Sequence, residues 1–319
     1  MKTMQLFNRD GNGAAEIVRA IGLIANGIDF SKWEPILPLG VRDVVAIIGP
    51  TPVLKLSQYY IDGPELESDE SPDDMDAALA YLQQAVALFT WLRVIPTLDA
   101  QHDEGGRSRR LGENEKGLTA LQEYKDEANI LRMAYEAVDA LIDTMTAGEL
   151  PFWLLSAKYA QRENLLLRSR EQFDEFYFIG SSRLYVTLLP LIREVQECEV
   201  EPIIGRERMV ECLNYPTPRP AMRETAARAV ALLTMKKAVE RLPVQVIPEG
   251  VVQVQQSQPV NSKLRAEQSA RQSVAASLGN DAARLLSRLQ MMVAAEDETP
   301  EASGSYTPGP IAHSKGMTF

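Results

Sequence analysis

The residues most suited to catalysis or metal binding are few and lie far apart in the sequence. The chain contains two histidines, His102 and His313, and two cysteines, Cys198 and Cys212. Zinc sites need cysteine or histidine ligands at short, regular spacings, and a nucleophile needs a base within reach. Neither pattern occurs around these four residues, so the sequence predicts no catalytic residue, no metal site and no bound cofactor. We therefore expect the protein not to be an enzyme.

Acidic residues gather in two stretches, and neither has the spacing of a catalytic or calcium site. Residues 62–76 lack the alternating acids, central glycine and distal glutamate of an EF-hand loop, so we interpret them as a solvated linker. Asp174 and Glu175 lie within the aromatic run Phe173–Phe178. Because the two acids are adjacent on one segment, they cannot face each other across a glycosidic bond. We interpret this run as a packing surface between modules.

The most basic stretch is Gly105–Arg110, which carries Arg107, Arg109 and Arg110. It lacks the strand, glycine-rich loop and helix that make a phosphate-binding motif. Two interpretations stay open: these arginines contact DNA or a partner, or the stretch is an ordinary mobile surface loop.

The overall charge of the chain points away from a nucleic-acid binder. The formal net charge is −11, whereas DNA-binding domains present a basic face. An acidic surface either keeps the protein soluble or provides a wall that DNA passes without sticking. The N-terminus lacks the apolar core of a signal peptide, and we find no stretch of the ~18 apolar residues that a membrane span needs. We expect a cytosolic chain without membrane contact.

The elements that position these residues are predicted to be helices, and the same order of helices occurs twice along the chain. Trp33–Gly49 and Leu189–Gly205 each read as a helix that stops at an Ile-Ile-Gly corner. Further along, Ala85-Val-Ala-Leu88 in one predicted helix matches Ala229-Val-Ala-Leu232 in another. A long amphipathic helix follows in each copy, at about 118–145 and 263–293. The shared order of these elements indicates an internal duplication.

The predicted fold is mainly α-helical, with two tandem helical-bundle modules. The first module covers residues 1–150, a joining helix covers 151–180, the second module covers 181–295, and an extended tail covers 296–319. A β-hairpin is predicted at least in the second module, at 243–255, where alternating valine and glutamine flank a Pro-Glu-Gly turn. The corresponding residues 96–112 of the first module are expected to form an irregular polar loop.

These residues resemble the head–tail connector (adaptor or neck) proteins of tailed bacteriophages and prophages, particularly a double-module group of otherwise unknown function. The resemblance covers roughly residues 16–295. It depends on the two Ile-Ile-Gly corners, the two Ala-Val-Ala-Leu helices and the Val244–Val254 hairpin. No catalytic residue is carried over from that family.

The resemblance implies a structural virion protein in a homo-oligomeric ring, twelve-fold in that family, between the portal protein and the tail or neck proteins. Such a ring lines the channel through which DNA passes without sequence-specific contact. The protein would then lie in the virion neck, after assembly in the host cytoplasm. The alternatives are a cytosolic helical scaffold or protein-interaction module, and an enzyme ranks last.

Partner contacts are expected at the hairpin and the tail. The hairpin edges can pair with a neighbouring subunit through the strands that carry Val244, Val246, Val252 and Val254. The tail is too polar to form a core, so we expect it to order only on a partner, with Tyr306 and Phe319 as its anchors.

Overall fold

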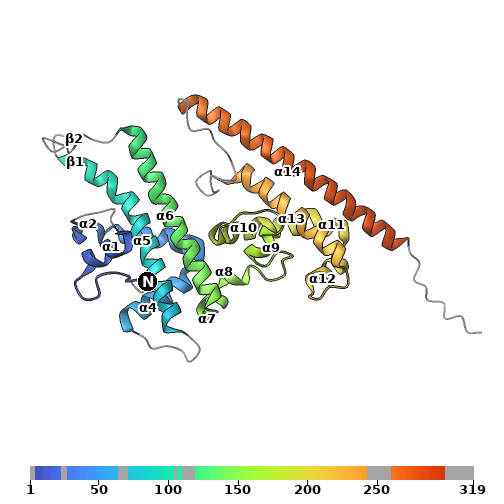
Figure 1. The fold of residues 1–319 in the computed structure, drawn as a ribbon, viewed down its shortest axis with the longest axis horizontal. Helices are drawn as coiled ribbons and strands as arrows, with labels where there is room; N and C mark the ends of the chain where they lie inside the picture. The colour runs from blue at the N-terminus through green and yellow to red at the C-terminus, as the bar shows by residue number, and fades with distance from the viewer. Residues whose placement is uncertain are drawn as a thin grey trace, which may run out of the picture.

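The computed structural model describes residues 4–22, 27–63, 71–103, 106–109, 119–242 and 260–298, with the backbone alone at 99–103, 106–109, 120 and 260–268. The chain is mainly helical and follows one element order twice, which confirms the predicted mainly α-helical fold and agrees with two tandem modules. Figure 1 shows the modules side by side, with the first in blue to green and the second in yellow to red.

Module 1 is built around two long helices that pack against each other. Its elements, in chain order, are α1 (Gly13–Ile21), α2 (Phe30–Trp33), α3 (Leu37–Ile48), α4 (Pro50–Asp62), α5 (Pro72–Asp99), β1 (Ala100–Asp103), β2 (Gly106–Arg109) and α6 (Ala120–Ala147). Helices α5 and α6 form an antiparallel pair, and α1 and α3 pack on α5 (Figure 1). α6 begins at Thr119, whose side chain accepts a hydrogen bond from the Gln122 amide in a capping box.

The segment between the modules is not the single joining helix that the sequence predicted for 151–180. It contains three short helices, α7 (Pro151–Leu154), α8 (Ala157–Ala160) and α9 (Arg170–Asp174). Ser156 and Ser169 each accept a backbone hydrogen bond at a new helix start, so the chain restarts twice. Between them, Leu165–Leu167 are all buried, which is an extended pattern and not a helical one.

Module 2 repeats the order of module 1. Its elements are α10 (Ser182–Val195), the π-helical turn η2 (Gln196–Val200), α11 (Glu201–Ile204), α12 (Arg206–Leu213), α13 (Pro220–Arg241) and α14 (Val260–Asp297). Ser181 caps α10 by accepting a hydrogen bond from the Leu184 amide. With 38 residues, α14 is about 57 Å long and packs along α13. It also includes residues 296 and 297, which the sequence assigned to the tail.

The two Ile-Ile-Gly corners have the same backbone conformation. Gly49 has φ 83° and ψ 170°, and Gly205 has φ 79° and ψ 154°. This region is essentially restricted to glycine, because a Cβ atom would clash with the backbone. Each glycine ends one helix and begins the next, so the chain turns at the same point in both modules. The duplication therefore extends to local geometry.

The first module contains a hairpin where the sequence predicted an irregular loop. α5 continues through Pro96 to Asp99, and β1 then pairs antiparallel with β2, with Ala100 opposite Arg109 and Asp103 opposite Gly106. The prediction failed because the packed ends of α5 and α6 bring the intervening chain back on itself, which local sequence does not reveal. The hairpin predicted at 243–255 lies outside the described residues and stays a prediction.

One apolar core runs through both modules and includes α5. Its largest fully buried side chains include Trp153, Tyr185 and Phe173, which lie between the modules. By length and composition alone, residues 72–98 of α5 suffice to cross a bilayer, contrary to our expectation from the sequence. Half of the most apolar stretch of this helix is buried inside the structure, as in the core helix of a globular bundle.

Candidate functional site

The predicted arginine cluster lies at the tip of an arm that module 1 extends beyond its core. Arg107 and Arg109 are on β2, where Arg107 stands opposite His102 in the register, and Arg110 lies outside the described residues. Val244, Val246, Val252, Val254, Tyr306 and Phe319 also lie outside them. The structure thus places two of the predicted contact residues on one strand and leaves the others as predictions.

The arm itself consists of the end of α5, the β1–β2 hairpin and the start of α6 (Figure 1). Its helices expose apolar side chains: Leu98 is 37% exposed, Leu121 61% and Tyr124 57%. Ile130, further along α6, is only 1% exposed. The exposed residues therefore mark the part of the helical pair that the module's own core does not cover.

A second cluster of polar groups fixes the two modules to each other. The Asp139 carboxylate on α6 accepts hydrogen bonds from the Ser181 hydroxyl (2.8 Å) and the Arg183 amide (2.6 Å) at the start of α10. Asp143 accepts a hydrogen bond from the Ser182 hydroxyl one helical turn further on. Two carboxylates thus meet the N-terminus of α10, where the helix dipole favours negative charge.

Burial decides the electrostatics of this joint. Desolvation raises the pKa of Asp139 above its usual value, although hydrogen bonds from the Arg183 amide and the Ser181 hydroxyl oppose the shift. The buried Arg183 guanidinium stacks on the Tyr135 ring of α6, 3.9 Å from its centroid. This joint holds the relative placement of the modules, and it offers no substrate site.

Arg162, in the turn after α8, lies within a group of aromatic rings between the modules. Its guanidinium carbon is 4.3 Å from the Tyr159 ring centroid, 5.3 Å from that of Tyr185 and 5.7 Å from that of Trp153. The residue is only 8% exposed, and its Nε makes no hydrogen bond within the described part of the chain. The rings come from α7, α8 and α10, so this stack ties the joining segment to module 2. Sequence reasoning missed Arg162, because its aromatic neighbours are scattered along the chain.

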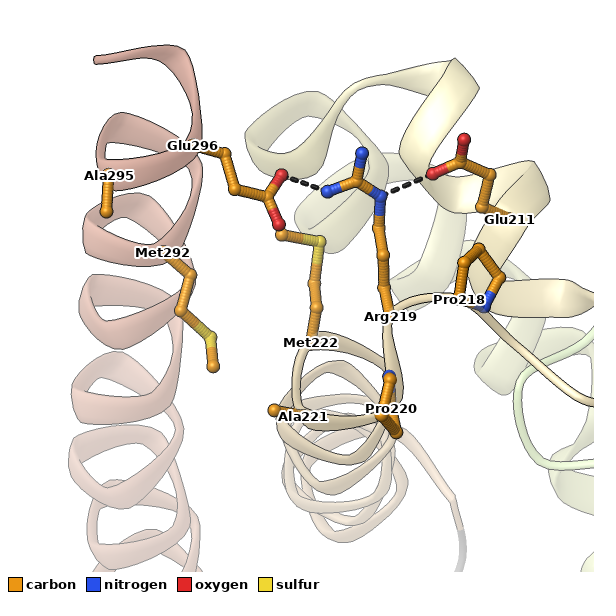
Figure 2. Close-up of a pocket in the computed structure, with 9 residues that line it drawn as sticks. All are labelled: Glu211, Pro218, Arg219, Pro220, Ala221, Met222, Met292, Ala295 and Glu296. Carbon is orange, nitrogen blue, oxygen red and sulfur yellow. Dashed lines mark hydrogen bonds and ion pairs between the residues drawn. The ribbon is translucent and has the colours of Figure 1, made fainter. Parts of the chain in front are cut away.

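Module 2 has an open pocket of about 510 Å³ where α13 begins and α14 ends. It is lined by Glu211, Pro218, Arg219, Pro220, Ala221, Met222, Met292, Ala295 and Glu296. Figure 2 shows Arg219 between two carboxylates, Glu211 of α12 and Glu296 of α14, and forming an ion pair with each. The two methionines supply an apolar wall below this network (Figure 2). The pocket combines an apolar floor with charged groups at its rim.

The cysteines have environments of different kinds. Cys198 lies on η2 and is exposed. Cys212 of α12 is buried, and burial raises the pKa of its thiol, which disfavours the reactive thiolate. Among the residues that the structure describes, no group of three or more His, Cys, Asp or Glu side chains could hold a metal ion.

The acidic aromatic run 173–178 serves the fold. The Asp174 carboxylate accepts hydrogen bonds from the Ile179 amide (2.7 Å) and the Gly180 amide (3.3 Å), so it closes a turn. Phe173 is fully buried, whereas Phe178 is 77% exposed. The run therefore packs between the modules at one end and reaches the surface at the other.

Together these features define a tandem-duplicated helical protein with two capped, tightly joined modules. The chain belongs to a family of unknown function (DUF6712), which matches it twice, at residues 54–163 and 209–309. The two matches begin four or five residues after Gly49 and Gly205, and they cover about two thirds of the chain. No curated protein sequence and no solved structure matches the chain.

Proposed function

We propose that this protein is a structural subunit of a homo-oligomeric ring, the head–tail connector of a tailed bacteriophage. In this proposal the ring lies between the portal protein and the tail or neck proteins, and DNA passes through it. The observation that carries the proposal is the arm of module 1, whose apolar side chains and strand pair extend beyond the core.

An arm of this kind favours a role in assembly. A two-stranded hairpin is marginally stable alone, and its outer edges can pair with a further strand. Leu121 and Tyr124 are more than half exposed, as expected for side chains that a neighbouring subunit covers. The tight joint at Asp139 supports a rigid two-module subunit, which suits a ring in which every copy has the same shape.

The charge and the chemistry of the chain are consistent with this role. A net charge of −11 supports a channel wall that repels the phosphate backbone of DNA. Arg107 and Arg109 lie together on β2 at the arm tip, where they are suited to contact DNA or an acidic partner. We propose no catalytic activity, cofactor or membrane contact for this protein.

Light scattering coupled to size exclusion, followed by negative-stain microscopy, tests the proposal. The wild-type chain is expected to form closed rings, alone or with the portal protein. Leu121→Glu should lower the ring fraction by about tenfold or more, because it places a charge in an apolar contact. Leu155→Glu is the matched control, since Leu155 is 85% exposed but lies in the joining segment.

A chain that stays monomeric at high concentration and does not bind a portal protein would contradict the connector. That outcome would favour the cytosolic scaffold. The predicted hairpin at 243–255 has its own test: Val252→Pro removes a strand donor and should impair ring formation more than folding. Unchanged assembly of this variant would contradict strand pairing by that hairpin.

A further inference from the structure

The two modules differ at one end of their paired long helices. In module 2, the pocket of about 510 Å³ lies where α13 begins and α14 ends. In module 1, the corresponding end lies where α5 begins and α6 ends, and the chain that follows α6 covers it. There Gly148 sits so close to Asp74, on the first turn of α5, that an added Cβ would lie 3.0 Å from the carboxyl carbon.

The covering segment of module 1 is Leu150–Trp153. Leu150 and Trp153 are fully buried and Phe152 is 6% exposed. The Trp153 indole donates a hydrogen bond to the Thr146 hydroxyl on the last turn of α6 (2.9 Å), and α7 packs on α4. The segment thus turns back at once and places two aromatic side chains against the module that it has just left.

The family match includes part of the tail that follows module 2. In module 1 the match continues to residue 163, well past Leu150–Trp153. In module 2 it continues to residue 309, which includes the first eleven residues after Glu298. Each match thus continues past the last helix of its module, α6 in module 1 and α14 in module 2, so the family pattern includes residues 299–309 of the tail. The sequence of this segment is Thr-Pro-Glu-Ala-Ser-Gly-Ser-Tyr-Thr-Pro-Gly, with Tyr306 as its single aromatic residue.

From this comparison we propose that residues 299–309 dock into the pocket of their own module and place the Tyr306 ring against Met222 and Met292. The chain enters this segment beside the pocket, since Ala295 and Glu296 line it. Pro300 and Gly304 are suited to the turn that a return requires.

The chemistry of the pocket matches a tyrosine. Thioether groups pack favourably on aromatic rings, and Met222 of α13 and Met292 of α14 supply two of them from neighbouring helices (Figure 2). Arg219 and Glu296 at the rim offer a cation for the ring face and an acceptor for the phenol hydroxyl. A cation beside an aromatic ring already occurs after α6, where Trp153 is buried next to the Arg162 guanidinium.

Chymotrypsin cleavage after Tyr306, followed by mass spectrometry on the full chain, gives the first test. Wild-type protein should be cut there slowly, and Met292→Glu should accelerate this cut by about tenfold or more, because it places a charge against the docked ring. Met291→Glu is the matched control, since Met291 is the adjacent helical residue and is 67% exposed. Circular dichroism must show that both variants keep their helices.

Disulfide trapping gives the second test and identifies which copy supplies the tail. In a Cys198→Ser, Cys212→Ala background, the pair Met222→Cys and Tyr306→Cys should crosslink within one chain, and Met291→Cys with Tyr306→Cys should crosslink far more slowly. A crosslink between two chains would overturn docking in the same module. Equal trapping of both pairs, or equal cleavage of both glutamate variants and wild type, would overturn docking altogether. Because both readouts report on single chains, they are independent of whether the protein forms a connector ring.

Discussion

The modules agree at the corner between their short helices and differ at the end of their long ones. Gly49 and Gly205 share a backbone conformation that other residues rarely adopt, and each is followed by a short helix and then a long helical pair. Beyond the pair, module 1 continues into α7 and buries its end, whereas module 2 ends in an open pocket. The chain that leaves module 1 leads directly into module 2, and its residues Leu150 and Trp153 are buried at the end of module 1 as part of the core. The open end of module 2 is the site at which we propose that the tail residues 299–309 dock.

The largest expected effect separates a buried module end from an open one. Trp153→Ala should lower the free energy of unfolding by about 3–5 kcal/mol, because it leaves a cavity and removes a ring from the Arg162 stack. Met292→Ala should cost only about 1 kcal/mol or less, since its side chain lines an open pocket. Urea unfolding followed by far-UV circular dichroism measures both. Similar losses at the two positions would show that the module ends are equally closed.

Next in size is the cost of a side chain at the two corners. Gly49→Ala and Gly205→Ala should each lower the free energy of unfolding by about 1–3 kcal/mol, because both backbones lie in a region reserved for glycine. Gly49→Ala should lose more, since its Cβ would meet the Lys158 side chain at 3.2 Å, whereas Gly205 has open space.

Gly279→Ala is the control for the two corner variants, as Gly279 is a helical residue of α14 with ordinary contacts around its Cβ position. That substitution should stabilise the protein by roughly 0.5–1 kcal/mol. Thermal melts of all three variants provide the comparison. An unchanged melting temperature for either corner variant would contradict the conclusion that the two corners have equivalent backbone conformations.

The joint between the modules should show a pH dependence that neither module shows alone. Burial raises the pKa of Asp139, so the folded protein binds this proton more tightly than the unfolded chain does. The pKa of Asp139 is about 3.8 in the unfolded chain and higher in the folded protein. The contribution of Asp139 to the free energy of unfolding therefore falls as the pH rises from the first pKa through the second. Asp139→Asn should remove this contribution, so stability relative to wild type should improve between acidic and neutral pH.

Asp143→Asn provides the matched control at the joint, because Asp143 is one helical turn away and its side chain is 48% exposed. Difference curves between each variant and wild type are needed, because other groups act in the opposite direction. Arg241 and Lys237, for example, lower the pKa of Glu194 to about 2, which contributes stability that is lost as pH falls through that range. A flat difference curve for Asp139→Asn would contradict the electrostatic description of the joint.

The sequence predicted the parts of the fold that depend on local signals. The Ile-Ile-Gly corners combine an apolar helix end with a glycine stop, and Ser181 is followed at once by the apolar pattern of α10. The long helices α6 and α14 show sustained helical periodicity, so their ends were placed within a few residues. These features repeat in the chain, and the repetition made each of them easier to identify.

The parts that the sequence did not predict depend on tertiary contacts. Helices of four or five residues, such as α7–α9, lack enough periodicity to be seen, and they form because Trp153 and Phe173 are buried. The pocket depends on where α14 ends relative to α13, and Arg162 has its rings from three different elements. Charge-bearing residues near such sites cannot be grouped before the fold is known.

The smallest expected effect tests whether surface ion pairs hold the open end of module 2. Arg219 joins Glu211 of α12 to Glu296 of α14, and Arg208 also pairs with Glu296 at 3.1 Å. Arg219→Gln should lower the free energy of unfolding by only about 0.2–1 kcal/mol, since these side chains are partly exposed and screened by water. The loss should disappear in about 1 M salt, where the Debye length is only ~3 Å. Arg206→Gln is the control, since Arg206 is 87% exposed and its ion pair with Glu201 spans only the Gly205 corner. Hydrogen exchange at the last turn of α14 should rise in the Arg219 variant and stay unchanged in the Arg206 variant, because Arg219 pairs with Glu296 on that turn, whereas Arg206 pairs with Glu201. Unchanged exchange there would mean that Arg219 does not hold the end of α14, which the remaining pairs of Arg208 with Glu296 and Asp297 would then keep in place.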